Sequence, residues 1–121
     1  MTEKTKSIKG SFHLAIRTVT LVPSTKNVSD VITKAEFDSR IQETKKFLSG
    51  LFGGYTRWQT QGGYVINEKD INEKVAFVMA YAQKDVFKKY KKKWISWAKQ
   101  KKKEWGQDSI GLIIEDDLFY L

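Results

Sequence analysis

Hydrophobic and polar residues alternate along separate stretches of this chain, as they do in β-strands that bury one face. The alternation predicts strands over residues 12–22, 55–61 and 74–81, and a shorter apolar run predicts a last strand over residues 109–114. Pro23 should end the first strand before a polar loop at 24–30. Gly62 and Gly63 predict a break or bulge before residues 64–66, and residues 67–72 predict a polar turn. Residues 118–121 could extend the last strand.

Two further stretches have the period of an α-helix. Thr33 and Glu36 have the spacing of a capping box, which predicts a helix start, and Gly50 is the expected C-cap. The apolar face of this helix should consist of Phe37, Ile41, Thr44 and Leu48. A longer helix is expected over 84–105, with Gly106 as its stop. Its apolar stripe comprises Phe87, Tyr90, Trp94, Trp97, Ala98 and Trp105, and Lys101 falls inside that stripe.

The predicted elements follow the order β-α-β-β-α-β. This order is typical of the ferredoxin-like α+β fold, a four-stranded antiparallel sheet with two helices on one face. A chain of 121 residues is long enough for one such domain. We expect a single domain over residues 11–121 and a disordered polar tail over residues 1–10.

The strand at 74–81 predicts how the two faces of the sheet differ. Ala76, Val78 and Ala80 alternate with bulkier side chains, and small residues leave room for the aromatic stripe of the second helix. We therefore expect Phe77, Met79 and Tyr81 on the face away from the helices. A second copy of the chain, sheet against sheet, or stacked nucleobases could cover that face. Since the RNA-recognition octamer pattern fits poorly here, a homodimer is the preferred interpretation.

The net charge of +8 lies entirely in the second predicted helix. Residues 84–104 contain ten lysines and two acidic residues, whereas basic and acidic residues balance in the rest of the chain. One lysine-rich face with like charges at i,i+4 predicts contacts with nucleic-acid phosphates or another polyanion. Lysine outnumbers arginine nineteen to three, which favours little sequence specificity. The expected contacts are Lys88, Lys89, Lys92, Lys93, Lys99 and Lys103; an acidic protein partner or simple solubility would also account for them.

Residues able to support catalysis are scarce. The chain has no cysteine, and its single histidine, His13, has no evident partner residue. Residues 115–117 are acidic, but consecutive carboxylates on a strand alternate in direction and do not converge on a metal. No phosphate-binding or dinucleotide motif is present. We expect no cofactor, no metal and no catalytic residue, and with no secretory signal or apolar run of about 20 residues we expect a cytoplasmic protein outside the membrane.

Four short motifs resemble a family of short, functionally uncharacterised ferredoxin-like proteins. The family pattern has a Phe-x-Gly-x-Thr turn, a Gly-x-Trp hairpin, a Glu before the third strand and a Phe-Gly-Gln-x-Ser segment. The matching stretches here are Phe52-Gly-Gly-Tyr-Thr56, Gly62-Gly-Tyr64, Glu73-Lys-Val75 and Trp105-Gly-Gln-Asp-Ser109. Tyr64 replaces the tryptophan and Trp105 the phenylalanine of that pattern. The resemblance implies the same fold and, since related proteins pair into dimeric α+β barrels, a dimer; it implies no activity.

Three functional interpretations follow. The first is a small, non-enzymatic, homodimeric protein whose basic helix binds nucleic acid or another polyanion. The second is a dimeric α+β barrel with a small ligand between its sheets, which leaves an enzyme open. The third is a viral or mobile-element protein that binds a host protein. The face proposed for the dimer or ligand carries Phe77, Met79, Tyr81, His13, Arg17 and Trp58.

Overall fold

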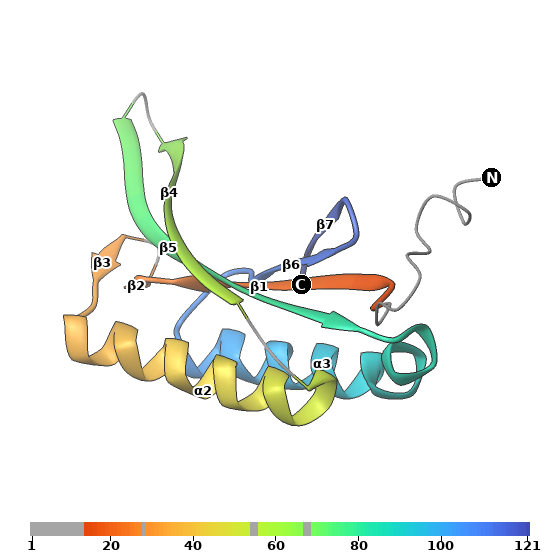
Figure 1. Ribbon diagram of the computed structural model, residues 1–121. Helices are drawn as coiled ribbons and strands as arrows, with labels where there is room; N and C mark the ends of the chain where they lie inside the picture. The colour runs from red at the N-terminus through yellow and green to blue at the C-terminus, as the bar shows by residue number, and fades with distance from the viewer. Residues whose placement is uncertain (1–13, 28, 54–55, 67–68) are drawn as a thin grey trace.

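The computed structural model describes residues 14–27, 29–53, 56–66 and 69–121. Its main sheet contains β1 (Ile16–Pro23), β4 (Thr56–Ile66), β5 (Lys69–Ala82), β6 (Gly111–Ile114) and β7 (Asp117–Tyr120). The order across the sheet is β4-β5-β1-β6-β7, and all neighbouring strands are antiparallel. Helices α2 (Lys34–Phe52) and α3 (Lys84–Glu104) both lie on one face of that sheet (Figure 1). The predicted ferredoxin-like α+β fold is confirmed, with β7 added at one edge.

The core lies between the sheet and the two helices. Ala76, Val78 and Ala80 of β5 are almost fully buried there, as their alternation predicts. Small side chains on the sheet leave room for Trp94 of α3, which is completely buried. The Trp94 Nε1–H donates a hydrogen bond to the Thr20 Oγ1 of β1 over 3.0 Å, so the polar atom of this large side chain is satisfied inside the core.

Helix α2 begins as the sequence predicts and ends later. The Thr33 Oγ1 accepts a hydrogen bond from the Glu36 amide over 3.1 Å, which confirms the N-cap. The expected C-cap at Gly50 is wrong, because the helix continues to Phe52 and buries Leu51 and Phe52 in the core. Gly53 ends it instead with a left-handed φ of 92°, and its amide donates to the Ser49 carbonyl. The predicted apolar face of Phe37, Ile41, Thr44 and Leu48 is confirmed as buried.

Helix α3 follows its prediction within one residue at its C-terminal end. Gly106 then takes a left-handed φ of 63°, consistent with its expected role as the stop. Of the aromatic stripe, Phe87, Trp94 and Trp105 are buried, and Trp97 stacks on Phe47 of α2 with ring centroids 4.4 Å apart. The stripe therefore joins the two helices to each other and to the sheet.

Arg40 is a buried charge that the sequence pattern does not reveal. Its guanidinium donates to the carbonyls of Pro23, Thr25 and Trp105 over 2.8, 2.9 and 3.2 Å. Its Cζ also lies 5.3 Å from the centroid of the Trp105 ring. These contacts connect the end of β1 and the end of α3 through the middle of α2.

Several predicted strand boundaries are wrong because strand pairing overrides local composition. The polar loop at 24–30 contains a small hairpin of β2 (Thr25–Lys26) and β3 (Asp30–Val31). The register of β4 against β5 runs without a bulge through Gly62 and Gly63. It continues to the pair Ile66↔Lys69, so residues 69–72 are strand and not turn. The first strand begins at Ile16, and the predicted tail at 1–10, like residues 12–13, lies outside the described residues.

The acidic segment at 115–117 reverses the chain. Glu115 has a positive φ of 58°, and Ile114 pairs with Asp117, so β7 returns antiparallel to β6 and does not prolong it. In Figure 1 the β6–β7 hairpin rises from the sheet on the side away from the helices.

Candidate ligand-binding face

The sheet surface away from α2 and α3, here called the helix-free face, is assembled from alternate residues of β1 and β5. The cross-strand pairs Arg17↔Tyr81 and Leu21↔Phe77 fix its residues, because partners in an antiparallel ladder point to the same side. Phe77 and Met79 are half-buried, while Tyr81 has 44% of its surface exposed. The accessible end of the face is therefore the end that carries Arg17 and Tyr81.

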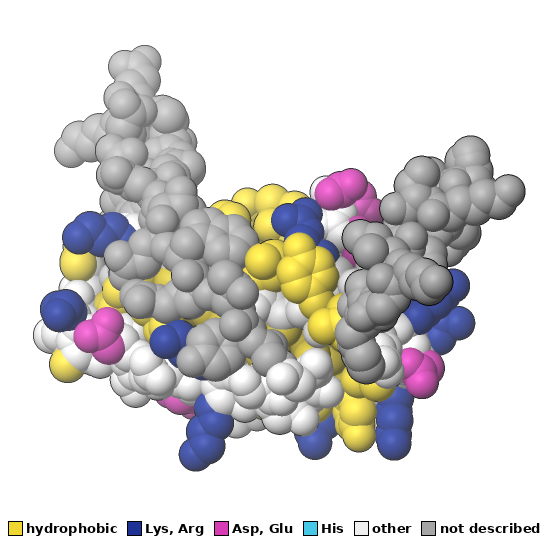
Figure 2. All heavy atoms as spheres, viewed as in Figure 1, with side chains coloured by type: hydrophobic (Ala, Val, Ile, Leu, Met, Phe, Trp, Pro, Cys, Tyr) yellow, Lys and Arg dark blue, Asp and Glu magenta, His cyan; other side chains and the backbone are white. Residues whose placement is uncertain are grey.

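The β6–β7 hairpin contributes a second set of apolar side chains to the same face. A Cβ placed on Gly111 would lie 3.0 Å from the Leu21 Cδ2 and 3.5 Å from both the Leu118 Cδ1 and the Tyr120 Cε1. These three side chains therefore meet above Gly111, where only glycine leaves room for them. Leu118 and Tyr120 are 47% and 68% exposed. Figure 2 shows hydrophobic side chains on this side of the molecule, beside basic and acidic ones.

A cluster of charged groups lies at the Tyr81 end of the face. The Arg17 Nη2 donates to the Glu115 carbonyl over 2.5 Å and to the Asp116 Oδ1 over 3.3 Å. The Arg17 amide donates to the Glu115 Oε1 over 2.6 Å, and the Glu115 amide donates to the Arg17 carbonyl over 2.8 Å. Glu115 and Asp116 thus set two carboxylates against the one guanidinium, so this end of the face is locally negative.

The sequence pattern predicted part of this face. Phe77, Met79, Tyr81 and Arg17 come together as expected. The backbone of Trp58 pairs with that of Phe77, which puts position 58 in the same row of the sheet, and His13 lies outside the described residues. Leu21, Leu118 and Tyr120 were missed. The position of Leu21 on this face could have been predicted from its alternation with buried Val22. The positions of Leu118 and Tyr120 depend on the chain reversal at Glu115, which the local composition does not predict.

The lysines predicted to contact a polyanion lie far from this face. All six are exposed on α3, on the opposite side of the sheet: Lys88, Lys89, Lys92, Lys93, Lys99 and Lys103. Lys101 behaves differently, since its Nζ donates to the Glu43 Oε2 over 2.5 Å and to the Glu104 Oε1 over 3.2 Å. Burial opposes its charge, but the hydrogen bonds to these two carboxylates outweigh burial and raise the pKa of Lys101 above its ordinary value of 10.5.

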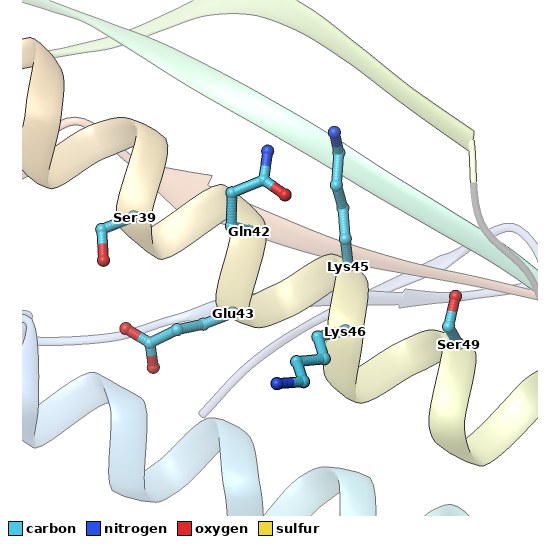
Figure 3. A pocket seen from close by; sticks show the side chains of 6 residues that line it. All are labelled: Ser39, Gln42, Glu43, Lys45, Lys46 and Ser49. Carbon is cyan, nitrogen blue, oxygen red and sulfur yellow. The ribbon is translucent and has the colours of Figure 1, made fainter.

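One further surface depression lies along α2. A depression of about 430 Å³ is lined by side chains of α2 alone, and Figure 3 shows them pointing to two sides of that helix. They are Ser39, Gln42, Glu43, Lys45, Lys46 and Ser49. The described residues include no cluster of metal-ligating side chains. None of the helices in the described part of the chain is long and apolar enough to cross a membrane.

Comparisons with known proteins find matches among solved structures. No family model and no curated protein matches the chain. Two solved structures do: a phage SAM lyase in complex with S-methyl-5′-thioadenosine, 12% identical, and a phage SAM lyase in the apo state, 11% identical. In each, the alignment covers 95% of both chains with a TM-score of 0.65. At this identity the likeness establishes the fold.

The comparison corrects the leading functional prediction. The prediction of a non-enzymatic protein that binds nucleic acid through its basic helix is contradicted, because the structural neighbours, which align over nearly their whole length, are enzymes. The resemblance to an uncharacterised ferredoxin-like family, the homodimer and the host-protein partner stay predictions.

Proposed function

We propose that this chain is an enzyme that binds S-adenosylmethionine on the helix-free face and splits it. The observation that carries the proposal is the shared fold with a phage SAM lyase over 95% of both chains. The shared fold favours the second interpretation of the sequence, a small ligand bound beside Tyr81 and Arg17. It also suggests the chemical class of that ligand.

The bond to be broken follows from the compounds themselves. S-Methyl-5′-thioadenosine keeps the methyl and adenosyl groups of S-adenosylmethionine, so the bond between sulfur and the aminobutyryl γ-carbon must break. The bonding electron pair goes to the sulfonium sulfur, which becomes a neutral thioether. A lyase adds no water, and the route that also needs no base is closure of the aminobutyryl fragment on itself. Its carboxylate oxygen attacks the γ-carbon, and the product is a lactone. This step needs no proton transfer; the protein has to hold the chain in a folded conformation with the two atoms in line.

The charge distribution of the described residues supports a cationic substrate on the helix-free face. With its sulfonium, ammonium and carboxylate groups, S-adenosylmethionine carries a net charge of +1 at neutral pH. Arg17 with Glu115 and Asp116 gives a net charge of −1 at one end of the face. The lysines of α3 lie beyond the helices on the other side of the sheet, where they would repel such a ligand. The exposed ring of Tyr81 offers a surface for adenine stacking or for a sulfonium–π contact.

The test is incubation of the purified chain with S-adenosylmethionine and detection of products by liquid chromatography and mass spectrometry. We expect S-methyl-5′-thioadenosine and the lactone in equal amounts, well above a protein-free control. S-Adenosylhomocysteine should stay intact, because its neutral sulfur is a poor leaving group. Tyr81→Ala should lower kcat/KM by at least about 10-fold if its ring contributes about 1.4 kcal/mol to binding the transition state.

A matched control is Val31→Ala. Val31 is 79% exposed on β3, away from the helix-free face, and its loss should leave kcat/KM unchanged. No product above the protein-free control at high enzyme concentration would refute the proposal. Homoserine present from the first time point, with no lactone preceding it, would show attack by water and therefore a hydrolase.

A further inference from the structure

The outer edge of β7 is exposed and, apart from Asp117 at its start, hydrophobic. β7 is the last strand of the sheet, and all four of its residues are exposed. Leu118, Phe119 and Tyr120 have 47%, 46% and 68% of their surfaces accessible. Proteins usually protect such an edge with lysine, proline or a bulge, because its backbone is a template for another strand. This chain has nineteen lysines, yet residues 109–121 contain neither lysine nor arginine nor proline.

The hydrogen-bond pattern identifies the backbone groups at that edge. Ile110 and Leu121 exchange both of their hydrogen bonds, over 3.3 and 2.9 Å. In an antiparallel ladder such pairs alternate with pairs that exchange none, so Phe119 bonds to β6 whereas Leu118 and Tyr120 do not. The amides and carbonyls of Leu118 and Tyr120 therefore point away from β6. Within the described residues no strand lies beyond them.

We propose that β7 pairs antiparallel with β7 of a second copy of this chain, so that one continuous sheet crosses both copies. The spacing of the outward groups sets the register: Leu118 of one copy opposes Tyr120 of the other, and the reverse. That register forms four intermolecular backbone hydrogen bonds and brings the two copies of Phe119 face to face on the two-fold axis. Leu118 and Tyr120 meet across the interface on the helix-free side, and the Phe119 pair meets on the helix side.

The area involved predicts a dimer that depends on concentration. From the 150–250 Å² that a large side chain carries, the three exposed fractions amount to about 300 Å² of side-chain surface per copy. That is less than the roughly 600–1,000 Å² per partner of a standard stable interface. The four backbone hydrogen bonds add to it, as in other β-augmentation complexes. This inference does not depend on the proposed enzymatic function.

The first experiment measures mass in solution. The full chain is studied by sedimentation velocity and light scattering over micromolar to millimolar concentrations. We expect the weight-average mass to rise from the 14.0 kDa of one chain towards twice that value. Phe119→Lys should suppress this rise, because it places two positive charges opposite each other at the two-fold axis. Tyr120→Pro should suppress it too, because it removes an outward amide without removing a bond to β6.

The control is Val31→Lys, which replaces an exposed apolar residue away from β7 and should dimerise like the parent chain. Thermal unfolding by circular dichroism checks that each variant folds. A chain that stays monomeric at millimolar concentration would overturn the proposal. A dimer that survives in folded Phe119→Lys and Tyr120→Pro would overturn it as well, because the contact must then lie elsewhere.

A second experiment tests the register. The chain has no cysteine, so one introduced thiol is unique. Under mild oxidation Phe119→Cys should give a disulfide-linked dimer, because the two copies of residue 119 oppose each other across a non-hydrogen-bonded pair. Leu118→Cys should crosslink at least about 10-fold more slowly, since its partner in this register is Tyr120. Equal rates for the two variants would refute the register.

Discussion

The hydrogen bond between Trp94 and Thr20 allows a quantitative test of the core. The indole N–H and the threonine hydroxyl lie 3.0 Å apart, and both side chains are fully buried. Within the described residues every buried polar side-chain atom has a partner, so removing one of them creates a new defect. Thr20→Val keeps nearly the same shape and removes the acceptor.

The expected cost is that of a buried donor without an acceptor. Water cannot reach the indole N–H, so Thr20→Val should lower the free energy of unfolding by about 1–3 kcal/mol. Trp94→Phe removes the donor together with part of a large ring and should cost more, because it also leaves a cavity. In the Trp94→Phe background there is no indole N–H that could lose its acceptor. Thr20→Val should then cost less than about 0.5 kcal/mol, and the coupling energy should be about 1–2 kcal/mol.

The assay is urea unfolding of the parent, both single variants and the double variant. Far-ultraviolet circular dichroism is the signal, because tryptophan fluorescence would change with the substitution itself. With a slope of about 1–3 kcal/mol per molar urea, the midpoint of Thr20→Val should fall by roughly 1 M. If Thr20→Val costs the same in both backgrounds, the two side chains are not coupled and the core argument is wrong.

The remaining predictions concern two glycines, Arg40 and Lys101. Gly106→Ala should destabilise the fold by about 1–2 kcal/mol, because φ is 63° there and the new Cβ would lie 3.3 Å from the Lys26 Cβ. Gly50→Ala, in open space inside α2, should stabilise it by about 0.5–1 kcal/mol, and urea unfolding measures both changes. Arg40→Lys should cost about 2–4 kcal/mol in urea unfolding, because a single ammonium cannot reach three separated carbonyls; a loss below 0.5 kcal/mol would contradict this. Because the pKa of Lys101 is raised, its pairing stabilises the fold below pH 10.5 and the stabilisation is lost as pH rises through the raised value. The parent should therefore exceed Glu43→Gln in stability by about 0.5 kcal/mol at pH 8, and the difference should vanish at the alkaline end of a pH series.

The candidate face was partly predictable because one of its strands reads as a simple alternation. A period of two assigns Ala76, Val78 and Ala80 to one side and Phe77, Met79 and Tyr81 to the other, and packing density then decides which side meets the helices. The same logic could not place Leu118 and Tyr120. Their contribution depends on a reversal at Glu115, a non-glycine residue in the left-handed region, which local composition disfavours.

The sequence alone determined the order of elements, the N-cap of α2, the extent of α3 and the two faces of β5. Each of these rests on interactions between residues close together in the chain or on a short period along it. Tertiary structure alone decided that residues 69–72 pair as strand although three of the four are polar, that Arg40 is buried against three carbonyls, and that β7 returns along β6. These outcomes depend on partners many residues away, whose hydrogen bonds and packing outweigh local propensity. The positive charge is a similar case: the sequence located it in one helix, and only the fold showed that it lies on the far side of the sheet from the face that a cationic substrate would use.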